Sequence, residues 1–146
     1  MKRIVIGLAA VLAAAVAAEV PLIQPADLAA QVASLMTVKP PIYYVGPNVL
    51  YRNKHIPGSI FAGMASTADG LEGLKTAVAR LPRDKPLVIY CGCCPWNHCP
   101  NIKPAMALLE QMGFTKAKAL YLPKDFKFDW IDKGYPVEAG TASKKQ

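Results

Sequence analysis

Cysteine is absent from most of this 146-residue chain. All four cysteines lie in one segment, YCGCCPWNHCP, which spans residues 90–100 and also holds one of the two histidines. This crowding excludes disulfides that would staple distant parts of the fold. A disulfide between such near neighbours would close only a short loop and remove little chain entropy. The clustering therefore indicates a chemical rather than a cross-linking role for the thiols.

The chain also has no basic run and no basic residues interleaved with aromatic ones, although its formal net charge is +7. It lacks the pattern typical of nucleic-acid binding, so we predict no nucleic-acid partner. The lysines are scattered, which is typical of a solvated surface. Their mild excess favours small anionic substrates through the overall field of the protein.

No apolar run reaches the roughly 20 residues that span a bilayer comfortably. A shorter run over residues 4–16 follows two basic residues and ends in the small-residue pattern AVA. This arrangement is typical of a secretory signal peptide. We predict a signal over residues 1–18, cleavage after Ala17 or Ala18, and a periplasmic or secreted protein without stable membrane association. A signal retained as an anchor is the alternative.

Short apolar runs and segments of helical periodicity alternate between the signal and a polar tail at residues 141–146, which we expect to be flexible. The runs predict strands over residues 42–45, 87–91 and 119–122, with a further short strand in HIPGSIFAG. Helices are predicted from Pro25 to Leu35, over 69–81, from Asn101 to Gly113, and over 126–133. This alternation predicts a single α/β domain over residues 19–140, with a mainly parallel central sheet flanked by helices.

Cys91 ends the run LVIYC, which we predict to be a central parallel strand. Pro104 sets the start of the next helix near Asn101, because proline is tolerated only in a first helical turn. The loop N–H groups and the positive end of that helix should then face the end of the strand. We therefore expect a lowered pKa for Cys91 and an anion site beside it, and Cys91 is the best candidate nucleophile.

Cys91 and Cys94 also form a C-x-x-C pair between a strand and a helix, which resembles the thioredoxin redox motif. A thioredoxin domain carries this motif near its N-terminus and needs several strands after it. Here only one helix, one strand and one short helix are predicted to follow. A thiol–disulfide oxidoreductase that uses Cys91 and Cys94 is an alternative function.

Four segments, in the same order, resemble the rhodanese family of sulfurtransferases. They are HIPGSI at 55–60, KPLVIYC at 85–91, ALLEQMGF at 107–114 and WIDKGYPVE at 130–138. The resemblance implies a rhodanese-like domain in which Cys91 is the catalytic cysteine. Such a domain takes a sulfane sulfur from a small anionic donor as a persulfide and passes it to a thiol acceptor, protein thiols included. It needs no cofactor.

The chain departs from the family where its arginines are expected. The D-x-R after the first strand is absent, and residues 43–47 read YYVGP instead. The loop after Cys91 is longer than usual and contains no arginine, since the last arginine of the chain is Arg83. Asn97 stands where related phosphatases place an arginine. Phosphate or arsenate chemistry is therefore disfavoured, because bidentate arginine usually holds such oxyanions.

The remaining thiols have two interpretations. Cys94 and Cys99 are assigned as catalytic, as resolving thiols that attack a persulfide or mixed disulfide on Cys91. A local disulfide that shapes the loop is equally consistent with the sequence. A disulfide between the adjacent Cys93 and Cys94 would be strained.

Four residues are assigned to substrate binding: Gly92, Cys93, Trp96 and Lys103. Trp96 would form a lid over the site or simply anchor the loop. Lys103 would attract an anion at the helix start, although a solvated lysine is the default.

The cysteines and His98 together could bind a soft metal such as Cu(I) or Zn²⁺. Their spacing matches no usual zinc pattern and lacks the C-x-x-C-H of haem attachment. No metal ligand is therefore assigned, and a non-enzymatic metal-binding module is a further alternative.

Overall fold

The computed structural model describes residues 19–35 and 38–140. The predicted signal and the predicted flexible tail both lie outside these residues. The elements run β1 (Leu22–Ile23), α1 (Pro25–Ala33), β2 (Ile42–Tyr44), α2 (Asn48–Asn53), β3 (Ile60–Phe61), α3 (Ala68–Val78), β4 (Leu87–Tyr90), α4 (Ile102–Gln111) and β5 (Ala117–Leu120). A 3-10 turn at Trp96–His98 and a π-helical turn at Lys127–Ile131 complete the domain.

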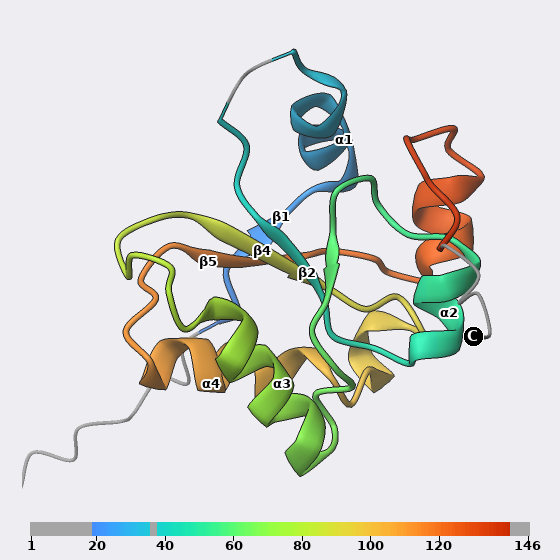
Figure 1. Ribbon diagram of the computed structural model, residues 1–146. Helices are drawn as coiled ribbons and strands as arrows, with labels where there is room; N and C mark the ends of the chain where they lie inside the picture. Colours follow the sequence, from blue (N-terminus) through green and yellow to red (C-terminus); the bar gives the residue numbers. More distant parts are fainter. Residues whose placement is uncertain (1–18, 36–37, 141–146) are drawn as a thin grey trace, which may run out of the picture.

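All five strands are parallel and form one sheet in the order β1-β5-β4-β2-β3 (Figure 1). The predicted α/β class, the parallel sheet and the central position of the LVIYC strand are confirmed. Tyr44 of β2 pairs with Tyr90 of β4, so these neighbouring strands end side by side. The carboxyl ends of parallel strands meet at one edge, and Cys91 lies at that edge.

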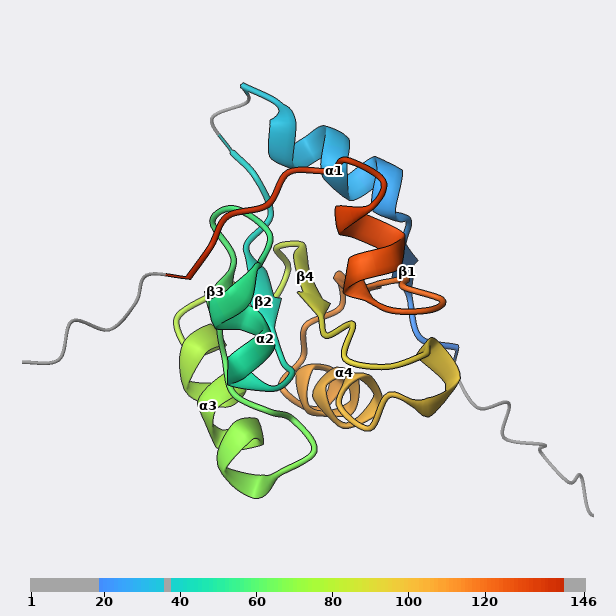
Figure 2. The ribbon, with the colours of Figure 1, turned by 90° about the vertical axis from the view of Figure 1, so that its right-hand side faces the viewer.

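The sheet is covered on both faces (Figures 1 and 2). Helices α3 and α4 pack against one face through buried residues such as Leu74 and Leu109. Helix α1 and the C-terminal turn cover the other, where Leu28, Phe126 and Trp130 lie in the core. Because both faces are buried, all four residues of β4 are apolar or aromatic and none is exposed. Among the described residues, no helix has the length and apolar character needed to cross a bilayer.

Two elements escape prediction from sequence. Strand β1 has only two residues between prolines, too few for a period-two pattern. Helix α2 has six residues and buries none of them, so it shows no apolar periodicity. The strand predicted over 119–122 is real but begins at Ala117 and ends at Leu120.

Candidate active site

Cys91 directly follows β4 and is only 1% exposed. Its neighbour Gly92 has a φ of +73°, a conformation that residues with a side chain rarely adopt. A Cβ on Gly92 would also lie 2.6 Å from the Cβ of Phe126. The Gly92 carbonyl accepts a hydrogen bond of 3.0 Å from the Phe126 N–H. Glycine is therefore required here so that the chain can turn sharply and hold Cys91 at the strand end.

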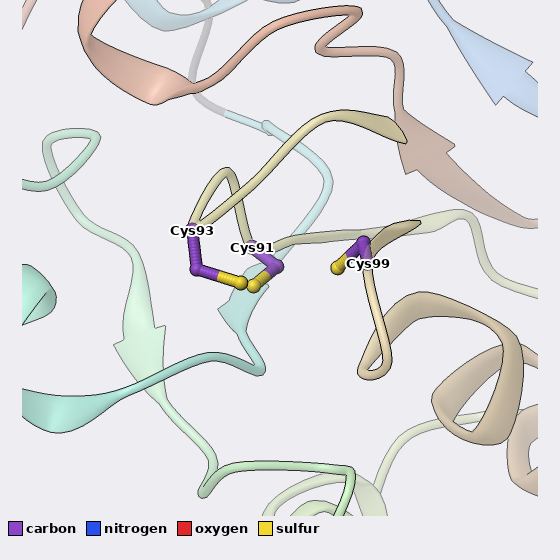
Figure 3. Close-up of side chains that lie close together, drawn as sticks. All are labelled: Cys91, Cys93 and Cys99. Carbon is purple, nitrogen blue, oxygen red and sulfur yellow. The ribbon is translucent and has the colours of Figure 1, made fainter. Parts of the chain in front are cut away.

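Three thiols meet at this point. The Sγ atoms of Cys91, Cys93 and Cys99 all lie within 4.8 Å of one another. Figure 3 shows the side chains of Cys91 and Cys93 converging, with the sulfur of Cys99 directed toward them from the other arm of the loop. None of the four cysteines forms a disulfide. The long loop therefore returns to the strand end and presents a cluster of free sulfur atoms.

Asn101 holds this cluster in place. It is 1% exposed, and its Nδ2 donates to the Sγ of Cys91 at 3.4 Å and to that of Cys93 at 3.8 Å. Its Oδ1 accepts from the Ser66 N–H at 2.9 Å. Asparagine at a helix N-cap usually accepts from the helix's own N–H groups, but this side chain makes no such bond. The sequence marked Asn101 only as a helix start, whereas the structure makes it a donor to two thiols.

The pKa values of Cys91 and Cys99 are shifted in opposite directions. A hydrogen bond to Cys99 and burial raise the pKa of the Cys91 thiol far above its ordinary value. The pKa of Cys99 is lowered to about 5 by the hydrogen bond from Cys91 and by the backbone N–H groups of Asn101 and Ile102. The expectation of a lowered pKa for Cys91 in the resting protein is therefore wrong. The N–H groups at the start of α4 reach the sulfur of Cys99 instead, and Cys91 keeps its proton.

Cys94 lies outside the three-thiol cluster. Its Sγ is 3.0 Å from that of Cys93 and donates to the His98 carbonyl at 3.6 Å. His98 itself is exposed. The structure thus brings Cys99 and Cys93 to Cys91, while Cys94 contacts Cys93 and Cys99 and lies outside the three-thiol cluster.

The two remaining predicted site residues, Trp96 and Lys103, do not belong to the three-thiol cluster. Trp96 packs edge-on against Tyr121, with ring centroids 5.3 Å apart, and the backbone N–H of Trp96 donates to the Pro123 carbonyl at 3.1 Å. This arrangement is that of a loop anchor. Lys103 is exposed and lines a different cavity, together with Val20 and Met106.

A cavity of about 240 Å³ opens beside Cys91, between α2 and the C-terminal π-helical turn. Its lining includes Gly92 and Cys93, two of the predicted substrate-binding residues. Lys54 and Lys127 bring positive charge to it, and Asp125 brings one carboxylate. Lys127 is paired with Asp132 at 2.8 Å, whereas Lys54 forms no ion pair within the described residues. The cavity therefore suits a small anion, with Lys54 as its available cation.

Tyr44 is the second residue that the sequence did not reveal. Tyr44 lines the cavity, and its hydroxyl is the one buried side-chain polar atom without a hydrogen-bond partner among the described residues. A Cβ on Gly46 would come within 2.6 Å of Cys91 Sγ and 2.7 Å of the Tyr44 hydroxyl oxygen, so both atoms flank the same point. Burial, and then the nearby thiol of Cys91, raise the pKa of Tyr44 and keep its proton on the oxygen. An unpartnered buried donor is costly unless a ligand uses it.

Solved structures share this arrangement of strands and helices. The rhodanese-like domain of the Alr3790 protein from Anabaena is 18% identical, with a TM-score of 0.60 over 86% of this chain and 83% of that chain. The protein has a rhodanese-like fold. The single-domain sulfurtransferase RDL2 of Saccharomyces cerevisiae is 17% identical, with a TM-score of 0.57 over 82% of this chain and 94% of that chain. No protein-family model and no curated protein matches the sequence.

A third structure, the BH2092 protein of Bacillus halodurans, is 21% identical, with a TM-score of 0.60 over 86% of this chain and 82% of that chain. Identities this low establish the rhodanese-like fold and leave the chemistry to the site itself.

Proposed function

We propose that the protein is a sulfurtransferase that carries a sulfane sulfur as a persulfide on Cys91. One observation carries the proposal. The thiol of Cys91 ends the central strand of a rhodanese-like fold and lines a cavity with lysines, and two further thiols lie within 4.8 Å of it. A small sulfur-donor anion fits this volume and this charge.

Loading begins with removal of the Cys91 proton. The Cys91 thiol is hydrogen-bonded to the Cys99 thiolate, and the two sulfur atoms hold one proton between them, so Cys91 becomes a thiolate when that proton moves across the hydrogen bond to Cys99. The Cys91 thiolate then attacks the outer sulfur of a donor such as thiosulfate. A Cys91–sulfur bond forms, the sulfur–sulfur bond of the donor breaks, and sulfite leaves with the electron pair. No net oxidant is consumed.

The persulfide carries a negative charge that needs donors in a buried site. Asn101 Nδ2 already lies 3.4 Å from the Sγ of Cys91. The free hydroxyl of Tyr44 flanks the same sulfur, and the lysines of the cavity contribute positive charge. These groups stabilise the anionic terminal sulfur more than the neutral thiol, so they favour loading.

Release follows by thiol exchange. The thiolate of an acceptor attacks the outer sulfur, takes it as a new persulfide and leaves the Cys91 thiolate behind. Because Cys91 is 1% exposed, a bulky acceptor reaches it poorly. Cys99 and Cys93 are less buried, and transfer of the outer sulfur to one of them would bring it toward solvent. Cys94, next to Cys93, extends this route outward.

The test is intact mass spectrometry of the reduced chain after incubation with thiosulfate or polysulfide. A gain of one sulfur that is abolished by Cys91→Ser and reversed by a dithiol supports the proposal. A loss of two hydrogens instead would favour thiol–disulfide oxidation between Cys91 and Cys94. Sulfur loading that persists undiminished in Cys91→Ser would move the role to another thiol.

We also propose that the protein is exported. The support is the sequence pattern over residues 1–18, which lie outside the described residues. N-terminal sequencing of the protein from its native cells should find a chain that begins at Ala18 or Glu19. An intact Met1 on protein in the cytoplasm would contradict the proposal.

A further inference from the structure

The three-thiol cluster has a geometry that sulfur transfer alone does not require. A persulfide needs one cysteine, and a resolving step needs one more. Here Cys91, Cys93 and Cys99 converge from two arms of the loop, with all Sγ atoms within 4.8 Å of one another (Figure 3). Three sulfur atoms that bind one metal in a plane at about 2.3 Å lie about 4.0 Å apart. The thiols therefore need to close by less than about 1 Å to share one cation.

We propose that Cys91, Cys93 and Cys99 form a three-coordinate site for Cu(I). The ligands are all thiolates, which select soft cations over Mg²⁺ or Ca²⁺. Among residues 19–35 and 38–140, no histidine, carboxylate or fourth cysteine completes the group at the same range. Structural Zn²⁺ takes four protein ligands, so the three-sulfur set favours Cu(I) over Zn²⁺. The cation replaces the remaining thiol protons, which leave to solvent.

The surroundings supply the outer contacts that metal thiolates need. Asn101 Nδ2 donates to the sulfur atoms of Cys91 and Cys93, while its own Oδ1 is fixed by the Ser66 N–H. The backbone N–H groups of Asn101 and Ile102 point at the sulfur of Cys99. Such donors orient sulfur ligands and offset their charge. Cys91 is buried and the other two thiols are half-buried, so solvent competes weakly for the cation.

Bound Cu(I) and the persulfide exclude each other, because both use the Sγ of Cys91. This consequence rests on the proposed function, whereas Cu(I) binding itself does not. The protein would then load sulfur on Cys91 when Cu(I) is absent and would not load it when Cu(I) is bound. Removal of the cation by a chelator would restore sulfur loading.

The experiment is an anaerobic titration of the reduced chain with Cu(I) against a coloured Cu(I) chelator. Native mass spectrometry should find one Cu(I) per chain, and X-ray absorption should find three sulfur neighbours. Cys93→Ser and Cys99→Ser should each weaken binding by more than about 100-fold, since loss of even an outer partner costs about 10- to 100-fold. The matched control, Cys94→Ser, should bind Cu(I) as the parent does.

Several outcomes would overturn the site. These are equal loss of affinity in Cys94→Ser, a two-sulfur or four-ligand spectrum, or retention of Cu(I) by Cys91→Ser. Polysulfide loading with and without prior Cu(I) then tests the exclusion. Cu(I) binding without any sulfur loading would defeat the proposed function and leave the metal site intact. Sulfur loading without any Cu(I) binding would defeat the metal site and leave the proposed function intact.

Discussion

Cys91 and Cys99 belong to the same loop and contact each other, yet their surroundings are opposite. Cys91 sits at the end of a buried strand, is 1% exposed and has a raised pKa. Cys99 lies just before α4, is half-buried, and has a pKa lowered to about 5. Strand β4 positions the sulfur of Cys91, whereas the N–H groups at the start of α4 stabilise negative charge on the sulfur of Cys99.

This division has a chemical use. A thiol that is buried and protonated at rest is protected from indiscriminate oxidation, because the thiolate is the reactive form. In the proposed mechanism, Cys91 becomes reactive when its proton moves to the neighbouring Cys99. Under the proposed function, the pair would act as a nucleophile with its own base, in the manner of a cysteine–histidine pair but with sulfur in both roles.

The largest effect should come from Cys91→Ser. Because only Cys91 both ends the central strand and lines the cavity, the variant should form no persulfide with thiosulfate or polysulfide. Intact mass spectrometry of the loaded chain measures this directly. A thermal unfolding curve close to that of the parent would show that the fold survives.

The next largest effect should come from Cys99→Ser, which removes the proposed proton acceptor and keeps the nucleophile Cys91. Loss of the proton acceptor should slow loading by about 100-fold, at the low end of what general-base catalysis contributes. In the parent, the Cys99 thiolate is present above a pH of about 5 and is lost below it, so loading should fall only as pH drops through that value. In the variant, loading should instead rise with alkaline pH, as Cys91 ionises by itself. A pH–rate profile that is unchanged by the substitution would show that Cys99 is not the base.

The general position of this site could be predicted from the sequence. LVIYC is an apolar run bounded by turns, and it became the central strand with Cys91 at its end. The alternation of runs and periodic segments was sufficient for the class, because a parallel sheet buried on both faces leaves a clear apolar signal. The short β1 and α2 were not predictable, since neither buries enough residues to leave a pattern.

The interior of the site was not predictable, because it depends on contacts that cross the fold. The sequence offered both Cys94 and Cys99 as partners of Cys91, whereas the path of the loop brings Cys99 and Cys93 to Cys91 and leaves Cys94 outside the cluster. The helix start was placed correctly near Asn101, but which sulfur its N–H groups reach depends on the path of the loop. Tyr44 read as a strand residue, and only the structure shows its free hydroxyl beside Cys91.

Tyr44→Phe should have a smaller effect on loading, and it tests whether the Tyr44 hydroxyl donates a hydrogen bond to the persulfide. If the hydroxyl donates to the persulfide, its loss should slow loading about tenfold, which corresponds to one hydrogen bond to a charged group. Stability should move the other way, because the variant removes a buried polar atom that has no partner in the resting protein. The control is Tyr43→Phe on the opposite face of the same strand, which should leave loading unchanged. Slower loading together with a lower melting temperature would indicate a merely structural tyrosine.

Cys94→Ser should have the smallest effect and bears most directly on the sequence-based pairing. Its Sγ contacts Cys93 at 3.0 Å and does not belong to the cluster around Cys91. Single-turnover loading should therefore match the parent, because no atom of Cys94 takes the Cys91 proton or touches the donor cavity. Release to a dithiol should slow, but less than in Cys99→Ser, since Cys99 belongs to the cluster around Cys91 and Cys94 does not. Stopped-time mass spectrometry of loading and release, with the Cys94/Cys99 double variant alongside, measures both steps. If Cys94→Ser alone were as defective in loading as Cys91→Ser, the C-x-x-C pair would be the functional unit, and a thiol–disulfide oxidoreductase would replace the sulfurtransferase.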